Sequence, residues 1–171
     1  MNFRVSYIAS PKIEPKAGDL LLFVRPHRLF DYVIKLLMWT PYYHVGLYTG
    51  DNSVLEARPW GVAINTLQGR EDWFVVAPAP EGKGPEALAW AKTQIGARFD
   101  RWNMLHVLLE HLSIKVPMTS LPSGKYSCGE FVATAFYHAG VRLFPNEDLD
   151  DVAPKDFARF LPKDNSARPR V

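Results

Sequence analysis

The strongest constraint on the fold is a series of short apolar runs in the first half of the chain. The runs are rich in β-branched and aromatic residues, and glycine, proline, asparagine or aspartate separates them, which is the pattern of short β-strands. They cover residues 19–25, 44–50, 53–59, 61–67 and 72–79. The sequence therefore predicts that most of the first half of the chain is β-sheet.

The second half changes to helical periodicity. In residues 84–96 a first-turn Pro85 and a terminating Gly96 bound a run with one apolar face, which is typical of a helix. The apolar positions of that face are Leu88, Ala91 and Ile95. Further helices are predicted over 100–114, 127–140 and, between the first two strands, 28–39. Strands followed by helices indicate the α+β class, with an antiparallel sheet of about five strands packed against helices. We expect one domain over 1–171 with a core from about 18 to 160.

Composition excludes several classes of function. Of 171 residues, 47% are hydrophobic, which is enough for a core without disulfides or metals. A formal charge of +2 gives no indication of a nucleic-acid partner. The single cysteine excludes an internal disulfide and a multi-cysteine metal cluster, and His106 and His111 lack same-face ligand spacing. Without a phosphate loop or cofactor motif, we expect no cofactor and no metal.

The chain shows no targeting segment. Residues 1–19 lack an apolar run long enough for a signal peptide, and 29–39 is about half a membrane span and carries Asp31 and Lys35. These features predict a cytoplasmic protein, although export by another route stays open. The oligomeric state and any protein partner are not predicted.

The segment "PYYHVGLYTGDNSVLEA", residues 41–57, reads as a hairpin carrying one histidine and one glutamate. A three-residue loop at 50–52 would pair Gly46 with Glu56 and His44 with Arg58. His44 and Glu56 then share a face as diagonal neighbours, and Gly46 leaves space for Glu56 to lean over it. A two-residue loop would put Glu56 on the other face. The alternative role for Glu56 is a surface salt bridge with Arg58.

Cys128 lies in "KYSCGEFVATAFYHAG", where a loop leads into an apolar-faced helix with Ser127 as its cap. The helix N-terminus favours thiolate, so the sequence predicts a lowered pKa and a nucleophile. Gly129 would let a substrate approach the backbone, whose N–H groups could hold an oxyanion. The alternative is a buried, inert thiol.

A resemblance joins these two segments. The order "GDLLLF", "YYHVGLYTGDNSVLEA", "GARFD", "YSCGEFVATAFYHAGV" and "DVAPKDFA" resembles the circularly permuted papain-like hydrolases of the NlpC superfamily, and most closely the YaeF/YiiX-type permuted amidases. The similarity runs from about Gly18 to Phe157. It also extends in fold to the lecithin:retinol acyltransferase-like enzymes, where histidine usually takes the place of Glu56. Phe99 replaces a tyrosine usual in the group, which puts a peptidoglycan substrate in doubt.

The resemblance implies a permuted papain-like fold and a role for each matching residue. Cys128 matches the nucleophile, His44 the general base and Glu56 the polar residue that orients the base. Together they would cleave an acyl bond through a thioester. The residues predicted to bind substrate or an oxyanion are Tyr43, Gly46, Tyr126 and Gly129. For Tyr126, packing on the core is the alternative.

Three functions are compatible with this pattern. The first is an amidase or peptidase acting on a peptide-like or N-acyl amide. The second is a lipid acyl hydrolase or acyltransferase, with peripheral membrane contact through 28–39 by Leu29, Phe30, Val33, Ile34, Leu37, Met38 and Trp39. A core helix is the alternative for that segment. The third is a non-enzymatic binding module on the same fold.

Overall fold

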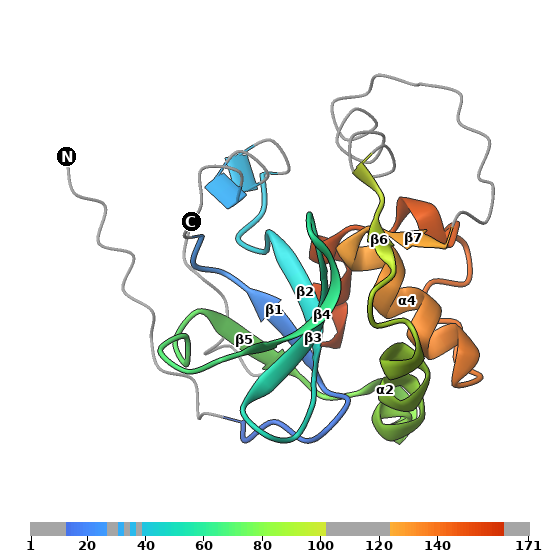
Figure 1. The fold of residues 1–171 in the computed structure, drawn as a ribbon, viewed down its shortest axis with the longest axis horizontal. Coiled ribbons are helices and arrows are strands. Elements are labelled where there is room, and N and C mark those ends of the chain that lie inside the picture. The colour runs from blue at the N-terminus through green and yellow to red at the C-terminus, as the bar shows by residue number, and fades with distance from the viewer. Residues whose placement is uncertain (1–12, 27–30, 33–34, 37–38, 102–123, 163–171) are drawn as a thin grey trace.

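A five-stranded antiparallel sheet forms the centre of the protein (Figure 1). The computed structural model describes residues 13–26, 31–32, 35–36, 39–101 and 124–162. The strands of the sheet are β1 (Leu20–Phe23), β2 (His44–Tyr48), β3 (Ser53–Arg58), β4 (Gly61–Thr66) and β5 (Phe74–Ala77). Each lies inside one of the five predicted runs, so the strand prediction is confirmed. Their spatial order is β4-β3-β2-β1-β5, and every neighbouring pair is antiparallel.

Helices and short connections follow the sheet in the chain. They are η1 (Pro80–Gly82), α2 (Gly84–Thr93), α4 (Cys128–His138), η2 (Leu149–Asp151) and η3 (Pro154–Phe160), and a small parallel pair joins β6 (Arg98–Phe99) to β7 (Lys125–Tyr126). The sheet and helices together are an α+β arrangement, as predicted. Figure 1 shows α2 and α4 side by side, beyond one end of the sheet in this view.

The helix predictions are confirmed for α2 and α4. Pro85 lies in the first turn of α2, and Leu88 and Ala91 are buried. Ile95 was expected on the same buried face, and this is wrong: α2 ends at Thr93, so Ile95 lies beyond the helix and is 51% exposed. The helix predicted over 100–114 lies outside the described residues apart from its first two positions. Most of 28–39 also lies outside them, although 31–32 and 35–36 are helical.

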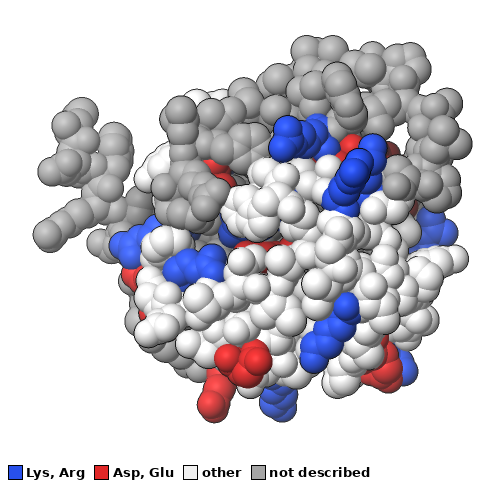
Figure 2. Space-filling model, viewed as in Figure 1, with Lys and Arg blue, Asp and Glu red and all other residues white. Residues whose placement is uncertain are grey.

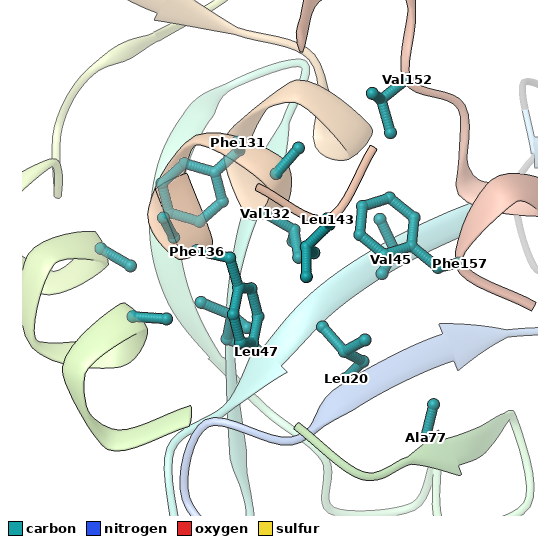
Figure 3. Packing of buried hydrophobic residues seen from close by; sticks show 14 of the residues in the cluster. Leu20, Val45, Leu47, Ala77, Phe131, Val132, Phe136, Leu143, Val152 and Phe157 are labelled. Atoms are coloured by element: carbon teal, nitrogen blue, oxygen red, sulfur yellow. The ribbon is translucent and has the colours of Figure 1, made fainter. Parts of the chain in front are cut away.

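The main hydrophobic core lies between the sheet and α4. Alternate residues of the strands, such as Leu20, Val45 and Leu47, meet Phe131 and Phe136 of α4 (Figure 3). The other face of the sheet carries a smaller apolar cluster. Its buried members are Leu21, Phe23, Tyr43, Val54 and Leu67. The inner strands β1, β2 and β3 are therefore covered on both faces, and β1 is buried along its whole length, whereas β4 and β5 at the edges are partly exposed.

On the face drawn in Figure 2, the described residues form no large patch of one charge. Figure 2 shows lysine and arginine interspersed with acidic side chains on the visible face. Among the described residues, no helix has both the length and the apolar character needed to cross a membrane.

Candidate active site

The hairpin of β2 and β3 has the predicted register. Leu47 pairs with Leu55, and the Thr49 N–H donates to the Ser53 carbonyl at 3.0 Å, which leaves a loop of Gly50, Asp51 and Asn52. Gly50 (φ 98°) and Asn52 (φ 58°) take left-handed conformations, which glycine and asparagine adopt at low cost. The predicted three-residue loop is confirmed, and with it the face on which Glu56 lies.

His44 and Glu56 form a buried hydrogen-bonded pair. Nε2 of His44 lies 2.5 Å from Oε2 of Glu56, and the two residues are 4% and 1% exposed. A Cβ added to Gly46 would lie 3.1 Å from the Glu56 Cβ, so the missing side chain gives Glu56 its space, as predicted. Because Glu56 engages Nε2, Nδ1 is the nitrogen left to accept a proton.

Aromatic rings fix the plane of the His44 imidazole. The ring centroid of Phe23 lies 5.4 Å from that of His44, and Tyr43 stacks at 6.3 Å. Both rings belong to the smaller apolar cluster, so the histidine is held by side chains of β1 and of the residue preceding β2. This packing limits rotation about the His44 side-chain bonds.

Glu56 has further partners besides His44. Nε of Arg58 donates to the same Oε2 at 3.0 Å, and Nδ2 of Asn65 donates to Oε1 at 3.1 Å. Arg58 also lies 3.7 Å from a carboxylate oxygen of Asp31. The alternative of a surface ion pair between Glu56 and Arg58 is right about the partners and wrong about the surface. The ion pair exists, but it is buried, and Glu56 keeps its contact with His44 as well.

These contacts determine the charges of the pair. Burial acts to raise the pKa of Glu56, but the neighbouring His44 and Arg58 outweigh it and lower that pKa to about 2. Burial, followed by the positive charge of Arg58, lowers the pKa of His44 despite the opposing effect of Glu56. At neutral pH the pair is an ionised carboxylate hydrogen-bonded to a neutral imidazole.

Cys128 is the first residue of α4. The hydroxyl of Ser127 accepts a hydrogen bond from the Glu130 N–H at 3.2 Å, and the Glu130 carboxylate accepts one from the Ser127 N–H at 3.0 Å. This reciprocal capping box confirms Ser127 as the cap and fixes where the helix begins. The thiol is thereby held at the helix N-terminus, and the residue as a whole is intermediate in exposure.

The predicted lowering of the thiol pKa is wrong. Desolvation raises the pKa of Cys128 to about 11, although the N–H groups of Val45, Gly129 and Cys128 itself and the charge of Arg58 all act to lower it. The helix N-terminus therefore lowers the pKa of the thiol, as expected, but desolvation by the close packing around the sulfur raises that pKa by more. The resting cysteine is a neutral thiol.

The sulfur faces β2 next to the histidine. The Val45 N–H that acts on the thiol belongs to the residue following His44. The registered pairs of β2 with β3 are Leu47–Leu55 and Tyr48–Val54, whereas β3 stays paired with β4 as far as Arg58–Gly61. The pairing between β2 and β3 therefore ends before His44. In the described sheet, Val45 has no registered partner on β3. Cys128 packs against the main core on the α4 face of the sheet, whereas the His44 ring packs against Phe23 and Tyr43 of the smaller cluster.

The residues predicted to bind substrate have other contacts. The Tyr43 hydroxyl donates to the Arg25 carbonyl at 3.1 Å within the smaller apolar cluster. The Tyr126 hydroxyl donates to the side chain of Gln94, the residue that follows α2, at 3.0 Å, and its ring packs on Trp90 and Phe131. These contacts favour the core-packing alternative for Tyr126 and give Tyr43 a structural role. Gly46 makes room for Glu56.

Gly129 has a packing role beside the one expected toward substrate. A Cβ on Gly129 would lie 2.0 Å from the carbonyl oxygen of Val152. The space beside this glycine is therefore filled by the chain between η2 and η3. A close contact between two backbone segments therefore explains the glycine by packing, and approach of a substrate to this backbone stays a prediction.

Sequence reasoning missed two features of the site. Alternation along β3 places Arg58 on the face of Glu56, but nothing local indicates that the guanidinium is buried against Asp31. The contact of the Val45 N–H with the thiol is made by the backbone, so no side chain in the sequence indicates it.

Comparisons of the chain with protein-family models and with curated proteins found no match.

Proposed function

We propose that the protein is a cysteine hydrolase that cleaves an amide bond, peptide-like or N-acyl, through a thioester on Cys128. The observation that carries this proposal is the buried 2.5 Å contact between His44 and Glu56, one residue from the Val45 N–H that faces the sulfur. A carboxylate that holds one imidazole nitrogen beside a thiol is the arrangement that nucleophilic acyl transfer needs.

The chemistry follows from the protonation states. Nδ1 of neutral His44 takes the proton of the Cys128 thiol as sulfur attacks the carbonyl carbon. The resulting imidazolium is stabilised by ionised Glu56, and it gives the proton to the leaving amine as the thioester forms. Water, activated by the same imidazole, then attacks the thioester, releasing a carboxylic acid and restoring the thiol. Three backbone N–H groups face the sulfur, those of Cys128, Gly129 and Val45. They would stabilise the negative charge that develops beside the sulfur during the attack.

We also propose that the fold is permuted papain-like. The order along the chain supports this: the strand with histidine and the strand with glutamate come before the helix that begins at the cysteine. Location in the cytoplasm stays a prediction.

A lipid acyl hydrolase is the second candidate, and one observation favours it. Tyr32, Leu36 and Trp39, in the segment between β1 and β2, are 56%, 78% and 90% exposed. Large apolar side chains so exposed are typical of surfaces that meet lipid or an apolar ligand. The predicted lipid-contact residues other than Trp39 lie outside the described residues. The same cysteine chemistry would then act on an ester.

The test is capture of the acyl-enzyme. The protein is mixed with a pool of N-acyl amides and short peptides, or with phospholipid vesicles, then quenched in acid and weighed intact by mass spectrometry. We expect a mass gain equal to one acyl group that hydroxylamine removes and that Cys128→Ala does not form. Released amine supports the amidase, and released fatty acid supports the lipid hydrolase. A folded protein that forms no adduct and releases no product would overturn the catalytic proposal in favour of a binding module.

A further inference from the structure

Arg58 is an unusually well-buried charge beside the candidate active site. The residue is 4% exposed, and its guanidinium lies over the ring of Phe23 at 5.6 Å and near that of Trp60 at 6.0 Å. Within the described part of the chain, its Nη2 atom has no hydrogen-bond partner. An apolar side chain of similar size would fill this space without burying a charge, so packing alone does not account for an arginine here.

The contact of Arg58 with Glu56 falls on one particular oxygen. Oε2 of Glu56 accepts from Arg58 Nε at 3.0 Å and lies 2.5 Å from Nε2 of His44. With Oε1 taken by Asn65, both oxygens of the carboxylate are engaged. The carboxylate therefore cannot rotate away from the imidazole without breaking an ion pair as well.

The charge of Arg58 also acts on both members of the proposed proton transfer. It opposes protonation of His44 and favours negative charge on Cys128. Asp31, 3.7 Å from Arg58, has the opposite effect on His44. Several elements contribute charged or titratable groups near His44: Tyr43 beside it, Glu56 and Arg58 on β3, and Asp31 before β2, while Arg70 acts on Glu56. The thiol of Cys128 lies by the N–H of Val45, the residue that follows His44.

We propose that Arg58 is a positioning residue of the relay: its guanidinium holds Glu56 ionised against Nε2 and keeps His44 a neutral base between turnovers. This inference rests on the proposed function, because a neutral imidazole matters only if His44 accepts the Cys128 proton. Arg58 is assigned no contact with substrate. It acts through Glu56 by hydrogen bonding and through His44 by charge.

The experiment is an NMR titration of His44 in the full chain. The five histidines are followed by their ring carbon–proton signals between pH 4 and 9, and the signal absent in His44→Gln identifies His44. Arg58→Met should move the His44 midpoint upward by about 1 pH unit or more, because a nearby like charge is removed. Arg58→Lys, which keeps the charge, should restore most of the original midpoint. Asp31→Asn should move the midpoint downward.

The controls separate charge from structure and from function. Arg98→Met removes an exposed arginine of β6 and should leave the midpoint unchanged. An unchanged midpoint in folded Arg58→Met, or a shift that Arg58→Lys does not reverse, would overturn the proposal. If Arg58→Met does not fold, the other two variants decide. An unchanged His44 midpoint in Asp31→Asn would overturn the proposal. An upward shift of about 1 pH unit or more in Arg58→Lys, which keeps the charge, would also overturn it.

Activity provides the second measurement. The acid limb of the pH profile for acylation of Cys128 should move in the same direction as the His44 midpoint in each variant. Absence of acylation by the wild-type protein would overturn the proposed function, and the titration would still test the effect of Arg58 on His44. The failures of the two proposals are thus distinguishable.

Discussion

The two faces of β2 and β3 are both buried but differ in chemistry. On the α4 face, β2 and β3 contribute Val45, Leu47, Leu55 and Ala57 to the main core. On the other face, the same strands bury His44, Glu56 and Arg58. Apolar burial depends on area and tolerates exchange among side chains of similar volume, whereas buried charges need each partner at hydrogen-bond distance. The difference teaches that the α4 face tolerates conservative exchange, whereas a change among the charged residues of the second face alters stability and chemistry together.

The largest expected effect is the loss of the Glu56 charge. Glu56→Gln keeps the shape of the side chain but leaves Arg58 buried without its closest counter-charge, so we expect the free energy of unfolding to fall by about 3–5 kcal/mol. Urea denaturation followed by circular dichroism measures this. The matched control is Leu47→Met, equally buried on the α4 face, which should cost below about 1.5 kcal/mol. Equal losses in the two variants would abolish the distinction between the faces.

The same variant gives a prediction for acid. The pKa of folded Glu56 is about 2, below its ordinary value of 4.5, so ionised Glu56 stabilises the folded state above about pH 4.5. This stabilisation is lost as the pH falls through the folded pKa. The slope of unfolding free energy between pH 4.5 and 2 should therefore be shallower in Glu56→Gln than in the wild type. A parallel slope would contradict the lowered pKa.

The second expected effect concerns the thiol at the start of α4, which packs against the main core. Because the pKa of Cys128 is raised to about 11, its alkylation by iodoacetamide should keep increasing from pH 7 to 10, by up to about a thousandfold. Mass spectrometry of the labelled chain measures the rate, with free cysteine, whose rate levels off above a pKa of about 8.5, as reference. A plateau already reached below pH 8 would indicate a stable thiolate–imidazolium pair and contradict the neutral resting state.

The third prediction removes the glycine next to the thiol. A Cβ at Gly129 would lie 2.0 Å from the Val152 carbonyl, so in Gly129→Ala the chain after η2 must move, at a cost of about 1–3 kcal/mol or more. Thermal unfolding measures the loss. Thr134→Ala, in the same helix, is the control and should change stability by less than about 0.5 kcal/mol. Unchanged stability of Gly129→Ala would show that no close backbone contact exists there.

The sequence predicted those parts of the fold and site that depend on local rules. Strand alternation and a three-residue loop were enough to bring His44 and Glu56 together, and the pattern around Ser127 was enough for the start of α4. The pKa of Cys128, the buried Arg58–Asp31 pair and the contact between Gly129 and Val152 could not be predicted in this way. Each depends on how closely distant segments pack, which neither periodicity nor spacing specifies.

The smallest expected effect is at the cap of α4. Ser127→Ala removes the hydroxyl that accepts from the Glu130 N–H, and loss of such a cap costs about 0.5–2 kcal/mol. Ser127→Asn can still accept this hydrogen bond and should retain most of the stability in urea denaturation. Since Cys128 follows the cap directly, fraying of the first turn would also release the sulfur from its close packing. Alkylation of Cys128 at pH 7 should therefore be faster in Ser127→Ala than in Ser127→Asn, and equal rates would show that the cap does not hold the thiol in place.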